Sequence, residues 1–143
     1  MRCYTYIEEI EEEKVLIYAK ERTKLVDEIE SLVISSDVDL TGTYNNEIIK
    51  IDINDVTCFI SENNKVFALI NDKRYQIKQR LYQLEEMNLN TFIKINQSCL
   101  ANKRNIKKFE STIGGALKVI FKNGYIDYIS RRELKNVKQR MGL

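Results

Sequence analysis

Residues 92–106, FIKINQSCLANKRNI, carry the clearest indication of the fold in this sequence. Residues 91–95 are mostly apolar and predict a short strand, and residues 97–102 predict a polar turn. Short strands separated by turns continue on both sides of this stretch, from Leu40 to the C-terminus. This succession of short strands and turns predicts a mainly β domain with short helices.

Downstream of this stretch, the sequence predicts a hairpin and a helix. Residues 115–121 pair with residues 125–130 across Lys122-Asn123-Gly124, because Asn-Gly supplies the positive backbone angles of a tight turn. Residues 131–141, RRELKNVKQRM, then predict a short basic helix, with Ser130 as a candidate N-cap. The expected core of this half of the chain consists of Phe92, Ile93, Ile95, Leu100, Ile106, Val119 and Phe121.

Upstream, residues 47–53 alternate apolar and polar side chains after a Tyr44-Asn-Asn turn, which predicts a strand. Residues 56–60 and 66–70 flank the turn of residues 61–65, so a second hairpin is expected. A short strand at residues 74–78 and a brief helix near residues 81–87 complete this part.

The first 40 residues predict a small β-β-α module. Residues 2–7 and 14–19 suit strands, and Thr23 precedes a helical face formed by Leu25, Val26, Ile29, Leu32 and Val33. Residues 35–37 end that helix. Because so small a module could hardly bury a core alone, we expect residues 1–40 to pack on the β domain and to serve dimerisation or docking of a partner.

Charge is divided unevenly along the chain. Residues 1–40 hold five basic and eleven acidic side chains, a net of −6, whereas residues 41–143 hold eighteen and ten, a net of +8. Residues 91–143 alone carry twelve basic and three acidic side chains, a net of +9. A basic domain joined to an acidic module indicates a polyanionic partner for the basic one.

Composition argues against several other classes of protein. The chain has no histidine and no CxxC pair, so we expect no enzyme, no metal site and no cofactor, and reduced, mostly buried thiols at Cys3, Cys58 and Cys99. The acidic N-terminus lacks the plan of a signal peptide, and no apolar run approaches the roughly 18 residues of a membrane span. A cytoplasmic location and no small-molecule substrate are therefore expected.

Residues 41–143 resemble the LytTR family of bacterial DNA-binding domains. Three stretches carry the resemblance: residues 53–67 (INDVTCFISENNKVF), residues 92–106, and Asn123-Gly124 followed by residues 129–135 (ISRRELK). The resemblance implies a transcription regulator, expected to act as a homodimer, whose loops enter successive major grooves of double-stranded DNA. The acidic module resembles that of small free-standing regulators of the family, for which a membrane-protein partner is common.

The resemblance and the residue types together suggest site residues. Glutamine and asparagine can bond adenine, and arginine can bond guanine; the expected base readers are Asn64, Lys65, Asn96, Gln97 and Arg132. Asn96 and Gln97 depart from the family's usual histidine and arginine, lysine or asparagine, which bears on the preferred base sequence. Phosphate contacts are expected from Lys94, Ser98, Asn102, Lys103, Arg131 and Lys135.

Simpler interpretations stand beside these roles. Asn64 can serve turn chemistry alone, and Asn102 can cap or tie a loop through backbone hydrogen bonds. Solvated surface charge, without a specific contact, is the interpretation for Lys107, Lys108, Lys118 and Lys138. The main alternative function is a protein-interaction module that docks a partner through the acidic N-terminal region and binds DNA weakly. An RNA-binding β domain is a poorer alternative, because no compact aromatic stacking motif is present.

Overall fold

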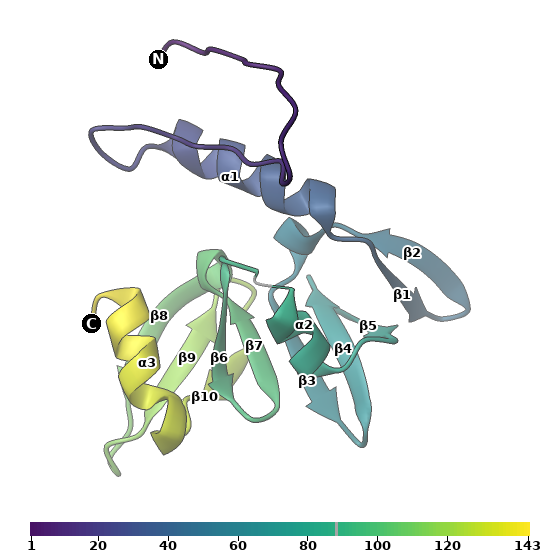
Figure 1. Ribbon diagram of the computed structural model, residues 1–143. Helices are drawn as coiled ribbons and strands as arrows, with labels where there is room; N and C mark the ends of the chain where they lie inside the picture. The colour runs from purple at the N-terminus through teal and green to yellow at the C-terminus, as the bar shows by residue number, and fades with distance from the viewer. Residues whose placement is uncertain (88) are drawn as a thin grey trace.

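The computed structural model describes residues 1–87 and 89–143, without the side chains of residues 34–37. In this part of the chain two antiparallel sheets make up a mainly β fold, as predicted (Figure 1). The larger sheet has the order β2-β1-β5-β4-β3-β7-β6 and the smaller sheet the order β10-β9-β8. Their strands are β1 Leu40–Tyr44, β2 Glu47–Ile51, β3 Cys58–Glu62, β4 Lys65–Ile70, β5 Lys73–Ile77, β6 Phe92–Asn96, β7 Cys99–Asn102, β8 Ile106–Ser111, β9 Leu117–Phe121 and β10 Ile126–Tyr128.

The first and last helices begin at the capping residues that the sequence predicts. The Thr23 hydroxyl accepts a hydrogen bond from the backbone N–H of Val26 at 3.3 Å, and that of Ser130 accepts one from Glu133 at 3.4 Å. The α-helices are α1 Lys24–Asp37, α2 Leu81–Glu86 and α3 Arg131–Met141, and short 3-10 helices occupy η1 Ile53–Asp55 and η2 Lys103–Asn105. The predicted bounds of α3 are confirmed.

Asparagine turns close the hairpins of the larger sheet. Asn45 and Asn46 join β1 to β2, Asn63 and Asn64 join β3 to β4, and all four have positive φ. Such paired left-handed residues match the twist of the flanking strands. The expected hairpin at residues 61–65 is confirmed, as is the one across Asn123-Gly124, where Gly124 has a φ of 88°.

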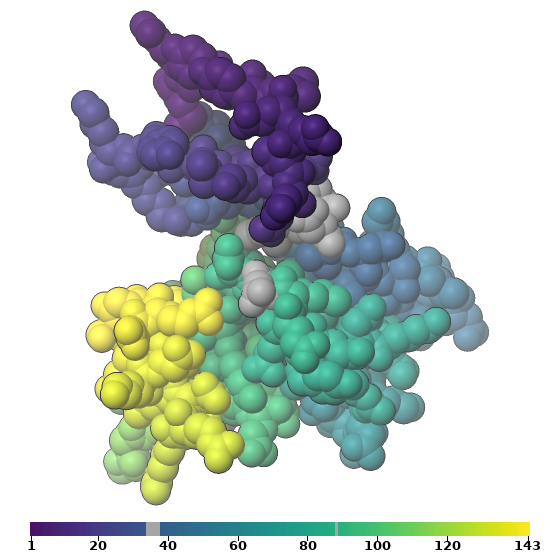
Figure 2. All heavy atoms as spheres, in the orientation of Figure 1, coloured from purple at the N-terminus to yellow at the C-terminus, as the bar shows by residue number. Residues whose placement is uncertain are grey.

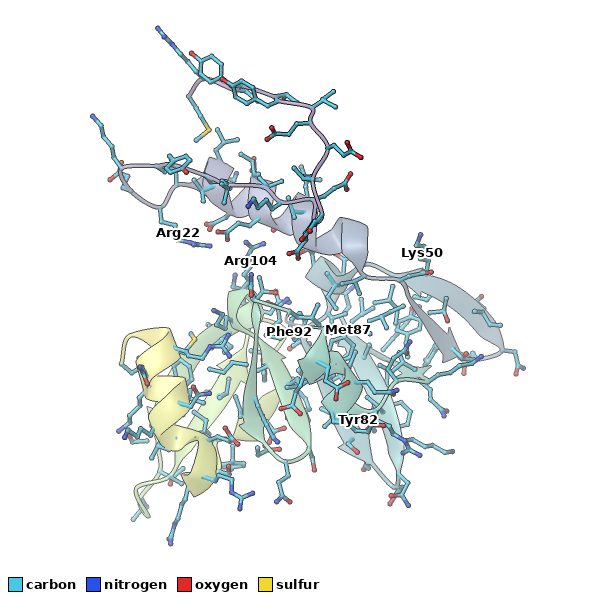
Figure 3. All side chains as sticks on the ribbon, in the orientation of Figure 1. Arg22, Lys50, Tyr82, Met87, Phe92 and Arg104 are labelled. Carbon is cyan, nitrogen blue, oxygen red and sulfur yellow. The ribbon has the colours of Figure 1, made fainter. Side chains whose placement is uncertain are left out.

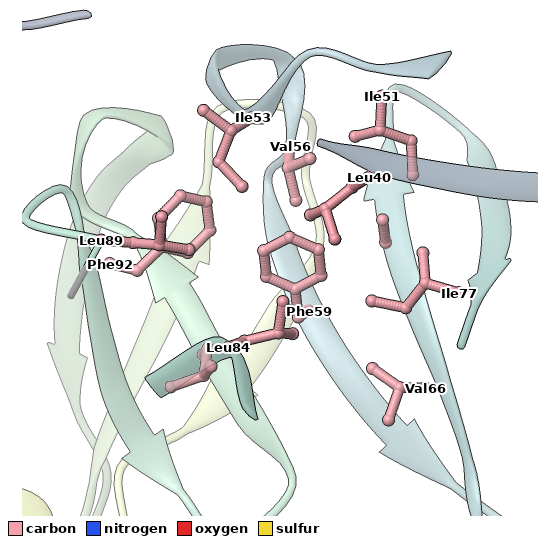
Figure 4. Packing of buried hydrophobic residues seen from close by; sticks show 12 residues of the cluster. Leu40, Ile51, Ile53, Val56, Phe59, Val66, Ile77, Leu84, Leu89 and Phe92 are labelled. Atoms are coloured by element: carbon pink, nitrogen blue, oxygen red, sulfur yellow. The ribbon is translucent and has the colours of Figure 1, made fainter. Parts of the chain in front are cut away.

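The strands at the centre of the larger sheet are buried on both faces. On one face Phe59 packs with Leu84 of α2 and Val66 of β4 (Figure 4). On the other face Cys58 and Cys99 lie in a second cluster with β9 and α3. The predicted core side chains are buried except Ile106, which is partly buried.

The three cysteines are free, and Cys58 and Cys99 are buried whereas Cys3 is exposed. A hydrogen bond with Cys58, together with burial, holds the pKa of the Cys99 thiol well above its usual value. A thiol with a raised pKa stays protonated and unreactive at neutral pH, which is consistent with a packing role for this residue.

Two expectations about residues 91–130 need correction. Residues 99–102 form strand β7 instead of continuing the predicted turn, and β8 was not predicted. All four residues of β7 are buried, so no apolar–polar alternation marks them as a strand. In β8 two lysines follow Ile106, and this segment pairs only with β9.

The predicted β-β part of the N-terminal module is wrong. Residues 1–23 contain no strand, and Tyr6, Ile7 and Tyr18 are 82%, 97% and 90% exposed. A strand needs a neighbouring backbone to pair with, and these residues find none in the described chain.

Helix α1 is the part of the module that packs on the domain. It lies across the end of the larger sheet where η1 and η2 are found (Figure 1). The Arg104 guanidinium donates to the backbone carbonyl of Asp27 at 3.0 Å, and Asn54 Nδ2 donates to that of Ser31 at 3.3 Å.

Candidate nucleic-acid interface

Three segments that are distant in sequence meet at the end of the sheets opposite α1 (Figure 1). They are the turn between β3 and β4, the turn between β6 and β7, and the first turn of α3; we call this region the loop edge. The Ser61 N–H donates to the carbonyl of Ser98 at 2.9 Å, and the Ser130 N–H donates to that of Ile95 at 2.8 Å. Backbone hydrogen bonds therefore hold the second segment to the other two.

Four predicted base readers lie exposed on the loop edge: Asn64, Lys65, Gln97 and Arg132. An amide side chain offers a donor and an acceptor side by side, and a guanidinium offers parallel donors. These groups match the hydrogen-bonding pattern of adenine and guanine in the major groove.

The β3–β4 turn is held from outside by Arg80, the residue before α2. Arg80 Nη1 donates to the backbone carbonyl of Asn64 at 2.6 Å. This contact uses only the backbone of Asn64, so the exposed side-chain amide remains accessible to DNA or solvent. The left-handed φ angles of Asn63 and Asn64 support turn chemistry as well, so a base contact at Asn64 stays a prediction.

Asn96 differs from the other predicted base readers, because its amide is used inside the protein. Asn96 Nδ2 donates to Asp127 Oδ1 at 3.0 Å and to the carbonyl of Tyr128 at 2.8 Å. Its Oδ1 accepts from the backbone N–H of Ser98 at 2.8 Å. This geometry supports a positioning role, in which Asn96 closes the turn that presents Gln97 and ties it to β10.

We expect Asn96→Ala to weaken specific DNA binding by up to roughly 100-fold, because the three hydrogen bonds that hold the Gln97 turn are lost and each contributes about 1 kcal/mol. A mobility-shift titration would measure this change, with Asn90→Ala as a matched control outside the loop edge. Unchanged affinity in Asn96→Ala would contradict the positioning role.

The side chains predicted to contact phosphates at the loop edge differ in their exposure and in their partners within the protein. Ser98, Arg131 and Lys135 are exposed. Lys94 is half-buried, and its Nζ lies 3.6 Å from a carboxylate oxygen of Glu85 on α2. A phosphate would therefore compete with Glu85 for Lys94, whereas Arg131 and Lys135 can meet one directly.

Asn102 and Lys103 lie at the other end of β7, near α1 and away from the loop edge, and the phosphate contact predicted for Asn102 needs correction because its side chain is buried. Asn102 is 1% exposed; its Nδ2 donates to the Val56 carbonyl at 2.9 Å, and its Oδ1 accepts from the Arg104 N–H at 3.1 Å. The simpler interpretation, a buried cap, describes Asn102. Lys103 is separated from Gln97 by the length of β7 and lies on a cleft beside α1.

Sequence reasoning missed two residues that shape the loop edge, Asp127 and Arg80. Each acts on a segment far along the chain: Asp127 contacts Asn96, 31 residues away, and Arg80 contacts Asn64, 16 residues away. No local motif marks either contact, so only the tertiary structure reveals them.

Comparison with known proteins decides the family. The family model of the LytTr DNA-binding domain matches residues 46–142. The chain belongs to this family. An uncharacterized HTH-type transcriptional regulator of Staphylococcus aureus (strain NCTC 8325) is 32% identical to this LytTr-domain protein over 125 residues, which cover 84% of the chain and 85% of the relative. A protein of the same description from the bovine strain RF122 is 33% identical over 125 residues, which again cover 84% of the chain and 85% of the relative.

A solved structure supports the fold of this LytTr-domain protein. The LytTr DNA-binding domain of a putative methyl-accepting/DNA response regulator from Bacillus cereus superposes with a TM-score of 0.69 and 16% identity, covering 74% of this chain and 99% of that one. Although the relatives are named HTH-type, strands separate α1, α2 and α3, and no helix-turn-helix occurs in residues 1–87 and 89–143.

Two other kinds of site are absent from the described residues. No cluster of three or more cysteine, aspartate or glutamate side chains there could hold a metal ion. No helix in the same part of the LytTr-domain protein has the length and apolar character that a membrane span requires.

Proposed function

We propose that this LytTr-domain protein is a bacterial transcription regulator that binds specific sites on double-stranded DNA through the loop edge. The observation that carries the proposal is the meeting of four exposed hydrogen-bonding side chains from three segments at one end of the sheets. The net charge of +9 on residues 91–143 supports it, because cations draw the DNA backbone toward this half of the protein.

In this proposal the segments of the loop edge enter successive major grooves of the DNA and contact bases there. Gln97 and Arg132 contact bases, with Asn64 or Lys65 as a third contact, and Asn96 orients Gln97. The protein is positioned on the DNA by phosphate contacts from Arg131, Lys135, Ser98 and Lys94. Loops can reach base edges in this way because the backbone hydrogen bonds between the three segments hold them on a rigid sheet.

We further propose that the protein acts in the cytoplasm as a homodimer on paired sites, with residues 1–40 serving dimerisation or the docking of a membrane-protein regulator. The exposed Tyr6, Ile7 and Tyr18 support an interaction role for this module, because large apolar side chains favour burial. The same observation supports the alternative function, a protein-interaction module with weak DNA binding.

A mobility-shift assay with genomic fragments at near-physiological salt separates the two functions. The regulator should retard a small set of fragments at concentrations that leave the others free. If every fragment is bound equally weakly, the interaction module is the better description.

We expect Lys135→Gln to weaken binding to all DNA sequences by a similar factor and to lower the slope of log affinity against log salt by about 1, because one phosphate contact is lost. Lys138→Gln, one turn further along α3, removes the same charge and is the matched control. Titrations at several salt concentrations measure both variants. A change confined to the specific site in Lys135→Gln would instead assign this residue to base reading.

A further inference from the structure

A cleft of about 690 Å³ lies beside α1, between parts of the N-terminal module and the DNA-binding domain. Residues 15–22 and α1 form one side of it, and η2 and the end of α3 form the other. Figure 2 shows the purple-to-blue N-terminal residues standing off from the yellow C-terminal helix. The cleft is at the opposite end of the sheets from the loop edge.

Two of the arginines on the cleft are already neutralised. Arg22 lies 2.8 Å from a carboxylate oxygen of Asp27 and 2.5 Å from one of Glu30. Arg104, which faces Arg22 across the cleft in Figure 3, lies 3.8 Å from Glu30. The two carboxylates of this site are therefore occupied by two arginines.

Two further cations on the cleft, Lys103 and Arg140, have no such partner. Neither lies within ion-pair distance of a carboxylate in the described part of the chain, and Arg140 donates only to the backbone carbonyl of Phe92, at 3.2 Å. Burial, and then the charge of Arg140 and of Arg22, lower the pKa of Lys103. Like charges gathered on a partly buried surface repel one another, and an anion between them relieves that repulsion.

The cleft also has an apolar wall. Val15 and Ile17 line it from the N-terminal side, and Met141 lines it from α3. The volume falls within the range of roughly 300–1,000 Å³ typical of small-molecule sites. A ligand that fills this cleft should therefore have an anionic group for the cations and an organic body for the wall.

We propose that this cleft is a binding site for a phosphate-bearing organic anion of about the size of a mononucleotide. Lys103 and Arg140 hold the phosphate, since lysine and arginine together suit its charge and its several acceptor oxygens. The ligand contacts the N-terminal module and the DNA-binding domain at once, so its binding favours the arrangement of α1 on the domain. Reading of DNA by the loop edge is a separate property.

The test uses the full-length protein in calorimetric titrations with adenosine monophosphate, and with adenosine as the uncharged comparison. We expect the monophosphate to bind and adenosine to bind at least about tenfold more weakly, because charge-assisted hydrogen bonds are lost. Lys103→Gln/Arg140→Gln should weaken the monophosphate by about tenfold or more on the same grounds. Lys107→Gln/Lys138→Gln, two exposed lysines, is the control of equal charge and should bind like the original protein.

Lys103→Gln alone is measured as well, because it keeps the Arg140 contact with Phe92 and is expected to fold normally. The proposal is overturned if the monophosphate and adenosine bind alike, if neither binds at millimolar concentration, or if both double variants lose binding equally. DNA affinity without nucleotide separates this site from the loop edge. A uniform loss of DNA binding in Lys103→Gln would make Lys103 a DNA contact and overturn the proposal, whereas unchanged DNA binding with lost nucleotide binding supports it.

Discussion

Gln97→Ala/Arg132→Ala is expected to abolish the preference of the protein for its own promoter site. Each good bidentate contact between a side chain and a base contributes about 1–3 kcal/mol of discrimination, so two lost contacts correspond to roughly 30-fold to 10⁴-fold weaker specific binding. Both side chains are exposed at the loop edge, so their removal should leave the fold intact. Competition titrations with specific and unrelated duplexes would measure the loss.

Lys138→Ala/Gln139→Ala is the matched control, because it removes one cation and one glutamine from exposed positions near the far end of α3. This control should keep the specificity ratio. If the Gln97/Arg132 variant kept its full preference while remaining folded, the loop edge would not be the reading surface.

Asn102→Ala is expected to lower the free energy of unfolding by about 2–3 kcal/mol. The substitution leaves the partly buried Arg104 N–H without its acceptor and opens a cavity beside Val56, and each effect costs on the order of 1 kcal/mol or more. Urea unfolding followed by circular dichroism would measure the change.

Asn105→Ala is the comparison, since Asn105 Nδ2 donates to the same Val56 carbonyl at 2.9 Å from a partly exposed position that water can reach. Its cost should be nearer 1 kcal/mol. If Asn102→Ala had normal stability but weakened DNA binding, the result would support the predicted phosphate contact of Asn102 and contradict its role as a buried cap.

Elements defined by local chemistry were predicted well. Helix α3 is bounded by the Ser130 cap and by Gly142, whose φ of 70° ends it, and both signals lie in adjacent residues. The Asn-Asn and Asn-Gly turns likewise need only their own backbone angles. Such elements follow from sequence because no distant contact is required to define them.

Strand β7 shows why the rest of the site could not be predicted. Interpreting residues 97–102 as one turn places Asn102 and Lys103 close to Gln97. A four-residue strand spans about 13 Å at 3.3 Å per residue, and this length carries Asn102 and Lys103 to the other end of the sheet. One missed strand therefore moves both residues away from the loop edge.

The N-terminal module shows a different limit. Residues 2–7 and 14–19 have the composition of strands, but composition does not say whether a partner strand is available. The helix of the same module was predicted correctly from its Thr23 cap and the spacing of its apolar residues, although Leu25 and Leu32 of the predicted face are exposed. Packing then follows from contacts such as Arg104 with Asp27, 77 residues apart, which no sequence pattern indicates.

The central claim, that loops of the LytTr domain read bases, is tested most directly by selecting binding sites from random duplex DNA with the original protein and with Arg132→Ala. We predict paired half-sites for the original protein, and for the variant the loss of preference at a guanine position in each half-site with the other positions unchanged. Identical selected sequences from the two proteins, or none from the original protein, would contradict the claim.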